Sequence, residues 1–150
     1  MKNKLISIFQ IIFPLIIGGI VALIINNYID YNYLNKPPLA PPKILFPIAW
    51  SIIYLLMGIS YYLYRKNNNN KLTITIYYLQ LFINALWSII FFVFKLRLLA
   101  IIWIIILLIT IIILLKQFKK ENITSYYLNI PYLLWTIFAT YLTIGIYLLN

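Results

Sequence analysis

Long apolar runs separated by short polar segments dominate the sequence. A helix needs about 20 apolar residues to cross a bilayer, and five segments meet or approach that length. We predict helices over residues 5–25, 44–64, 72–94, 98–115 and 126–149. Helices are favoured over barrel strands because the runs are long and do not alternate polar with apolar residues. The expected fold is an all-α membrane protein, a five-transmembrane-helix bundle.

The composition indicates that lipid is the main solvent of this chain. Of its 150 residues, 65% are hydrophobic and 9% are charged, against roughly 45–50% and about 25% in soluble domains. The runs follow one another without a soluble insert, so we expect one domain over residues 1–150. Residues 5–25 are interpreted as a retained span, because the run is longer than the roughly 7–15 apolar residues of a signal peptide.

The net charge of +10 is explained by anchors at the membrane flanks, and no nucleic-acid partner is expected. The bases divide unequally between the two ends of the predicted bundle. One end carries Lys2, Lys4, Arg65, Lys66, Lys71, Lys116, Lys119 and Lys120, and the other carries Lys36, Lys43, Lys95 and Arg97. The positive-inside rule then predicts a cytoplasmic N-terminus.

The residue inventory excludes most conventional chemistry. The chain has no cysteine and no histidine, and its two carboxylates, Asp30 and Glu121, lie outside the long apolar runs. Thiolate nucleophiles, histidine bases and paired intramembrane carboxylates are therefore unavailable. We expect no metal site, no required cofactor and no ordinary catalytic constellation. An ion-coupled transporter is also disfavoured, since it normally needs an acid or base within the membrane.

A polar stripe follows one face of the predicted third span. Gln80, Asn84 and Ser88 recur at four-residue steps, which brings them to the same side of a helix. The stripe fits either the wall of a ligand cavity or hydrogen bonding between helices, and spacing leaves both open. Aromatic residues on inward faces fit a flat apolar ligand, with core packing as the alternative. These residues are Trp50, Tyr54, Tyr77, Trp87, Phe91, Tyr132 and Trp135.

The connector over residues 26–43 differs from the other loops in its proline content. Proline fixes the backbone dihedral and removes a hydrogen-bond donor. We therefore predict a stiff, non-helical lid, with a simple rigid spacer as the alternative. The lid residues are Lys36, Pro37, Pro41, Pro42 and Lys43.

Several short motifs occur in an order that points to one family. They are Leu34-Asn35-Lys36-Pro37, Pro41-Pro42, Phe46-Pro47, Trp50 and Tyr54, then Tyr78-Leu79-Gln80-Leu81, Asn84, Leu86-Trp87-Ser88 and Phe91-Phe92, then Pro131-Tyr132-Leu133, Trp135 and Ala139-Thr140. Together they resemble the TspO/MBR family, the tryptophan-rich sensory proteins or translocator proteins, also called peripheral-type benzodiazepine receptors. The resemblance extends from about residue 18 to the C-terminus.

The resemblance implies a homodimer in a lipid bilayer, with a pocket in each five-helix bundle. Family members bind porphyrins such as protoporphyrin IX and isoquinoline carboxamide ligands. The expected ligand-binding residues are Trp50, Tyr54, Gln80, Asn84, Trp87, Phe91, Tyr132, Trp135 and Ala139. Trp50 and Trp135 match tryptophans tied to light-dependent porphyrin breakdown, which implies a photochemical role. Sterol binding is not expected, because no basic residue follows Tyr147.

Three functions follow as hypotheses. The first is a receptor or carrier for tetrapyrroles, in which Lys36 and Lys43 pair with propionates. The second is a light-dependent porphyrin-degrading activity, in which the bound ligand supplies the chemistry. The third is a membrane scaffold or regulator that senses ligand occupancy. The expected location is the plasma membrane of a bacterium.

Overall fold

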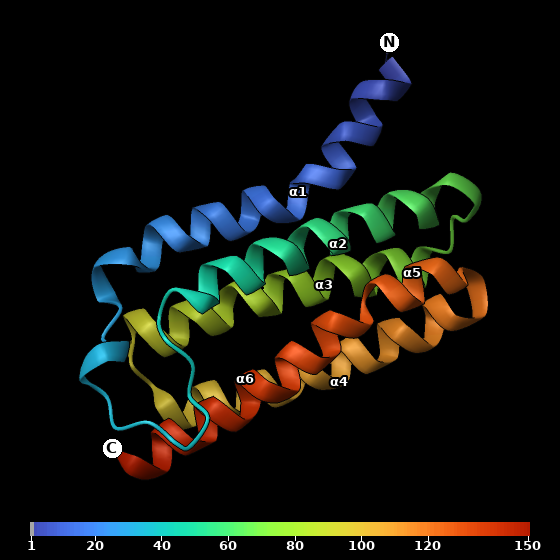
Figure 1. The fold of residues 1–150 in the computed structure, drawn as a ribbon. Coiled ribbons are helices and arrows are strands. Elements are labelled where there is room, and N and C mark those ends of the chain that lie inside the picture. The colour runs from blue at the N-terminus through green and yellow to red at the C-terminus, as the bar shows by residue number, and fades with distance from the viewer. Residues whose placement is uncertain (1) are drawn as a thin grey trace.

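The computed structural model describes residues 2–150, and its helices form one elongated bundle (Figure 1). The elements in chain order are α1 (Lys2–Ile25), the 3-10 turns η1 (Asn26–Tyr28) and η2 (Tyr31–Tyr33), α2 (Leu45–Asn67), α3 (Lys71–Ser88), the π-helix η3 (Ile89–Val93), α4 (Arg97–Glu121), α5 (Ile123–Leu128) and α6 (Ile130–Leu149). Within this described range, five helical stretches are long and apolar enough to cross a membrane. The prediction of an all-α, five-span bundle is confirmed.

Several helix boundaries differ from the predicted spans by a few residues, and the differences in the fourth and fifth spans have local reasons. The fourth helix continues to Glu121 instead of ending at residue 115, because lysine, glutamine and glutamate favour helix although they are polar. The connector after it reduces to Asn122, whose side chain caps α5 by accepting from the Ser125 N–H at 3.0 Å. The fifth span is divided at Asn129, and Pro131 occupies the first turn of α6, where its missing N–H costs little.

Helices α1 and α2 approach each other very closely at one crossing. A Cβ atom added to Gly58 on α2 would lie 1.8 Å from the carbonyl oxygen of Ile11 on α1, so only glycine fits there. Beyond this crossing the N-terminal part of α1 bends away from the bundle (Figure 1). Pro14 lies inside α1, and an internal proline removes a helical hydrogen bond and commonly kinks the helix.

The two ends of the bundle are built differently. At the end opposite the 26–43 connector, the Glu121 carboxylate accepts hydrogen bonds from Tyr64 Oη at 2.7 Å and Thr73 Oγ1 at 2.9 Å, and a third from Asn70. This polar clamp ties α2, α3 and α4 together. Nearby, the rings of Tyr61 and Tyr77 stack 4.1 Å apart. The connector end holds a second buried cluster, and beside it lies a cavity.

Candidate ligand-binding site

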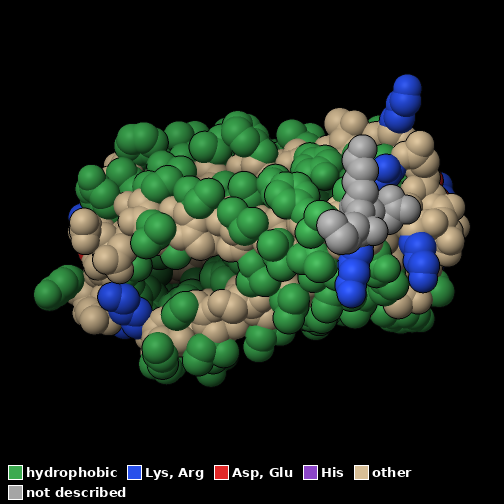
Figure 2. Space-filling view, turned by 90° about the horizontal axis from the view of Figure 1, so that it is seen from above, with side chains coloured by type: hydrophobic (Ala, Val, Ile, Leu, Met, Phe, Trp, Pro, Cys, Tyr) green, Lys and Arg blue, Asp and Glu red, His purple; other side chains and the backbone are tan. Residues whose placement is uncertain are grey.

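A cavity of about 520 Å³ lies at the connector end of the bundle. Its volume falls within the roughly 300–1,000 Å³ of pockets for drug-sized ligands. Figure 2 shows apolar side chains over the middle of one face, bases at both ends, and a hollow towards the connector end. The lining residues are Gly18, Val21, Ala22, Ile25, Asn26, Ile29, Tyr31, Lys43, Ile44, Phe46, Pro47, Trp50, Tyr54, Trp87, Ser88, Phe91, Phe92, Ala139, Leu142, Thr143 and Ile146.

Two aromatic pairs form much of the cavity wall. Trp50 and Tyr54 lie one turn apart on α2, so they share a face, and their rings stack at a centroid distance of 5.5 Å with 27° between planes. Trp87 at the end of α3 lies 5.6 Å from Phe91 of η3. Paired aromatic side chains offer a large apolar area at low conformational cost. The wall therefore suits the face of a flat ligand.

The π-helix η3 brings Phe91 into the wall and anchors it to the α4 N-terminus. The wide turn leaves the Phe91 carbonyl available, and it accepts a hydrogen bond from Arg97 Nη1. The same guanidinium lies 4.0 Å from the Phe91 ring centroid, and its Nη2 pairs with Asp30 Oδ2 at 2.8 Å. Arg97 thus links the first connector to the cavity wall. Single π-turns of this kind recur at functional sites.

Few polar groups face the cavity. The indole Nε1–H of Trp87 is buried and has no hydrogen-bond partner among the described residues, so a donor is available to a ligand. Lys43 is the one lining residue in the described range that carries a charge. Within residues 2–150, no group of three His, Cys, Asp or Glu side chains could hold a metal ion. The cavity thus combines an aromatic lining with the unpartnered indole N–H of Trp87 and the ammonium group of Lys43.

A buried hydrogen-bond network lies behind the aromatic wall. Tyr54 Oη donates to Asn84 Oδ1 at 2.9 Å, Asn84 Nδ2 donates to Tyr132 Oη at 2.9 Å, and Tyr132 Oη donates to Gln80 Oε1 at 2.7 Å. These bonds join α2, α3 and α6. Of the four residues only Tyr54 lines the cavity. The polar stripe of α3 therefore divides, since Gln80 and Asn84 bond other helices whereas Ser88 lines the cavity.

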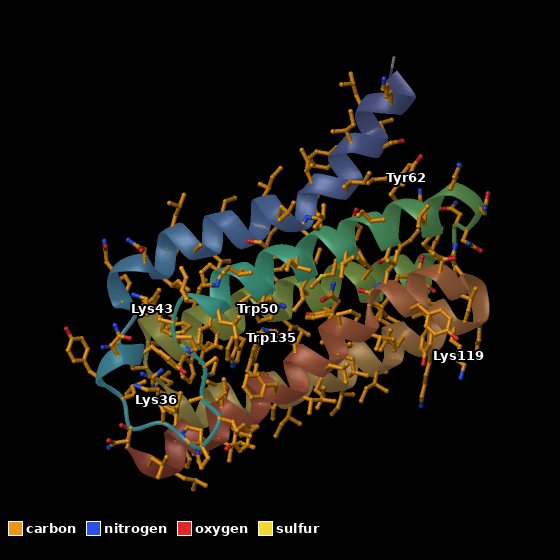
Figure 3. All side chains as sticks on the ribbon, in the orientation of Figure 1. Lys36, Lys43, Trp50, Tyr62, Lys119 and Trp135 are labelled. Atoms are coloured by element: carbon orange, nitrogen blue, oxygen red, sulfur yellow. The ribbon has the colours of Figure 1, made fainter. Side chains whose placement is uncertain are left out.

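The other two predicted residues on α6, Trp135 and Ala139, occupy different positions. Ala139 lines the cavity, whereas Trp135 does not line it and contacts the Trp50 ring instead. The two indoles meet edge to face, with centroids 6.4 Å apart and planes at 87°, and Figure 3 shows them close together between α2 and α6. Trp135 also contacts Phe46 at 6.0 Å. A contact between Trp135 and a ligand stays a prediction.

The proline-rich connector packs beside the cavity. Of its predicted lid residues, Lys43 lines the cavity, whereas Lys36, Pro37, Pro41 and Pro42 do not. The ammonium of Lys36 donates to the carbonyl oxygens of Tyr31 at 3.0 Å and Leu34 at 3.1 Å, away from Lys43 (Figure 3). The expectation of a wholly non-helical connector is wrong for η1 and η2, although the proline segment itself contains no helical turn among its described residues.

The sequence motifs gave no indication that α1 contributes to this site. Gly18, Val21, Ala22 and Ile25 all line the cavity. Their spacing of i, i+3, i+4 and i+7 is that of one helix face, but an apolar face gives no contrast within an apolar helix. The signal available in the sequence was the small size of Gly18, which marks a close approach between helices. In the structure a Cβ on Gly18 would lie 2.4 Å from the Tyr54 ring.

Comparison with known proteins agrees with this architecture. The model of the TspO/MBR family matches residues 10–149. The chain is 37% identical to a tryptophan-rich protein TspO from Archaeoglobus fulgidus, over 80% of this chain and 79% of that protein. It is 33% identical to one from Chlorobaculum tepidum, over 80% and 78%. It is 28% identical to protein CrtK from Rhodobacter capsulatus, over 89% and 86%. With its five apolar helices, the chain is an integral membrane protein that belongs to the TspO/MBR family.

Proposed function

We propose that this protein is a membrane receptor or carrier that binds tetrapyrroles such as protoporphyrin IX, and similar flat hydrophobic ligands, in its cavity. The observation that carries the proposal is the combination of an aromatic wall with a single cation, Lys43, among the described lining residues. A porphyrin has two apolar faces and an edge with anionic propionates. The faces would stack on indole and phenol rings, and a propionate would pair with the ammonium.

The two lysines of the connector differ in their availability to a ligand. Lys36 already donates two hydrogen bonds to carbonyl oxygens within the connector, and its ammonium lies 5.0 Å from the Tyr31 ring centroid. Lys43 is exposed and lines the cavity. We therefore narrow the expected propionate partner to Lys43. Isoquinoline carboxamide-like ligands lack that anion and would rely on the aromatic wall and the Trp87 indole N–H.

Binding is tested by titrating protoporphyrin IX into detergent-purified protein in the dark and following tryptophan quenching. Trp50→Ala removes ring area from the wall and should weaken binding about tenfold, equivalent to about 1.4 kcal/mol. Trp103→Phe is the matched control, because this indole donates to the Ile83 carbonyl at 3.0 Å and lies outside the cavity lining. Equal affinities in wild type, Trp50→Ala and Trp87→Ala would remove the cavity as the binding site.

A second candidate function is light-dependent porphyrin degradation. The contact that favours it is the edge-to-face pair of Trp50 and Trp135, which sets a second electron-rich indole behind the one that lines the cavity. The porphyrin would absorb the light, and the protein would hold it against the indoles. Trp50→Phe and Trp135→Phe should then retain dark binding and lose the light-driven change in the porphyrin spectrum. Unchanged conversion in both variants would contradict this candidate.

A ligand-sensing scaffold is the remaining function to test. Saturable binding without conversion favours a receptor or carrier. A partner protein that co-purifies only in one ligand state favours the scaffold. The absence of saturable binding would remove the tetrapyrrole proposal and leave the family assignment intact.

We also propose a homodimer in the bacterial plasma membrane with a cytoplasmic N-terminus. The orientation rests on the excess of bases at the end that carries Arg65, Lys66, Lys71 and the α4 C-terminus. Because the chain has no cysteine, single cysteines at the exposed Tyr33 and Asn67 can be labelled selectively. A membrane-impermeant maleimide added to whole cells should label Tyr33→Cys and spare Asn67→Cys.

The homodimer is tested by light scattering, which measures the mass of the purified protein in its detergent micelle.

A further inference from the structure

The exposed part of the cavity lining lies on one side of the bundle. Most lining residues are buried or half-buried, but five are exposed to the surroundings: Ala22, Asn26, Lys43, Ile44 and Pro47. The first two belong to the C-terminal end of α1 and η1, and the last three precede or begin α2. The cavity therefore opens sideways, between the end of α1 and the start of α2.

The surface around this opening is apolar. Leu23 next to it on α1 is 80% exposed, and Ile48 on α2 is 51% exposed. In a membrane-spanning bundle such side chains face lipid. Asn26 and Lys43 are the polar exceptions, and a lysine can lay its apolar stem along lipid while its ammonium reaches the polar interface. The opening thus has a largely apolar surround with one cation, Lys43, at its rim.

The connector, in contrast, is fastened to the opposite side of the bundle. The Asn35 N–H donates to Asn150 Oδ1 at 3.0 Å, and Asn150 Nδ2 donates back to the Asn35 carbonyl at 2.9 Å. Tyr141 Oη donates to the Pro38 carbonyl at 2.6 Å. These bonds hold the connector against α6, and lifting it would break all three.

Three further contacts fasten the connector. Asp30 pairs with Arg97 at 2.8 Å and with Lys95 at 3.4 Å, which ties the start of the connector to the α3–α4 turn. Pro37 is buried against Gly145 so closely that a Cβ there would lie 2.5 Å from the proline ring. None of these contacts crosses the opening between α1 and α2. A ligand that enters sideways leaves every one of them intact.

We propose that ligands enter the cavity from the lipid phase through the opening between α1 and α2, which we call the portal. Lys43 then selects amphipathic ligands with a carboxylate by holding the anion at the rim of this opening. The inference rests on the proposed function, because it assumes that the cavity is the ligand site. It assigns the proline-rich connector the role of a fixed cap. The expected ligand class is a membrane-dissolved, largely apolar molecule whose anionic group stays at the interface.

The portal is tested in the full-length protein reconstituted in lipid vesicles. Protoporphyrin IX is delivered from donor vesicles in the dark, and the rate of tryptophan quenching is measured. Ala22→Phe, which fills the portal, should slow association at least tenfold. Leu23→Phe is the matched control on the adjacent residue, which is exposed but does not line the cavity, and should stay within twofold of wild type. An unchanged rate in Ala22→Phe would overturn the portal.

A second variant tests the fixed cap without obstructing the portal. Asn35→Cys/Asn150→Cys, joined by a short bis-maleimide, locks the connector to α6 in a chain that has no other cysteine. The portal predicts an association rate that is the same before and after cross-linking. A rate that collapses on cross-linking would overturn the portal in favour of a moving lid, and this result does not depend on whether Ala22→Phe folds.

The anion selectivity has its own chemical control. Lys43→Gln should weaken the binding of protoporphyrin IX about threefold to fivefold, as expected for an exposed ion pair, and leave its dimethyl ester unchanged. Lys36→Gln should leave the binding of both porphyrins unchanged.

If wild type binds neither porphyrin, the proposed function fails. The portal is then tested with a brominated fatty acid in the vesicles, which quenches tryptophan fluorescence. Quenching that falls in Ala22→Phe but not in Leu23→Phe supports the portal. Equal quenching in both variants refutes it.

Discussion

Gly58 offers the sharpest test of how the bundle is packed. Adding a single methyl group by Gly58→Ala would set a Cβ atom 1.8 Å from the Ile11 carbonyl oxygen, 2.6 Å from its carbonyl carbon and 2.9 Å from its Cα. All three are backbone atoms, so no change of rotamer relieves the clash. Helix α1 as a whole must move away from α2 by more than about 1 Å, since non-bonded carbon atoms prefer separations of about 3.5–4.0 Å.

The cost of that displacement can be estimated from two opposing terms. Overpacking a close-packed site costs about 1–3 kcal/mol, and the upper end applies because backbone cannot repack. Alanine in place of a helical glycine recovers roughly 1 kcal/mol. We therefore expect Gly58→Ala to lower the free energy of unfolding by about 2 kcal/mol. The same displacement moves Gly18 and Val21 from the cavity wall, so porphyrin affinity should fall as well.

The assay is equilibrium unfolding by SDS in mixed micelles, followed by far-UV circular dichroism. Gly19→Ala is the matched control, because a Cβ at Gly19 meets no atom within 4 Å. That variant should gain roughly 0.5–1 kcal/mol from helix propensity alone. A Gly58→Ala protein as stable as Gly19→Ala would refute the close crossing of α1 and α2.

Three further predictions concern the hydrogen-bonded and charged groups. Tyr132→Phe removes the hydroxyl at which two bonds of the buried network meet, and should lower the unfolding free energy by about 1–2 kcal/mol; a wild-type value in the SDS titration would contradict this. Glu121→Gln weakens the clamp that includes Tyr64 and should cost about 1–2 kcal/mol in the same titration, with no loss of porphyrin affinity. Arg97→Gln removes the ion pair that ties Asp30 of the connector to the start of α4, and should speed proteolysis of the connector. Equal additional effects of Asp30→Asn in wild type and in Arg97→Gln would exclude coupling between the two residues.

Much of the fold could be predicted because its signals are local. The length of an apolar run decides whether a helix can cross a bilayer, and five such runs appear in the sequence and in the structure. Helix ends were less predictable, since the apolar run ends at residue 115 whereas α4 continues through a polar but helix-favouring segment to Glu121. The aromatic wall was partly predictable, because Trp50 and Tyr54 lie one turn apart on the same helix.

The rest of the site depends on which helix faces meet. Gln80 and Asn84 share a face with Ser88, yet the first two bond Tyr132 and only Ser88 lines the cavity. Hydropathy could not separate them from lining residues, because polar groups in a membrane turn inward for either purpose. Nor could it select the lining face of α1, since lipid-facing and bundle-facing side chains are equally apolar.

The sequence by itself determined the membrane class, the five helices, the unequal charge of the two ends and the family motifs. Each of these features depends on residues that are close together in the chain. Only the tertiary structure decided that Lys36 bonds connector carbonyls while Lys43 stands at the cavity rim. It also decided that Asp30 meets Arg97. Such contacts join residues far apart in the chain, and they exist only once the helices have packed and fixed which side chains can reach one another.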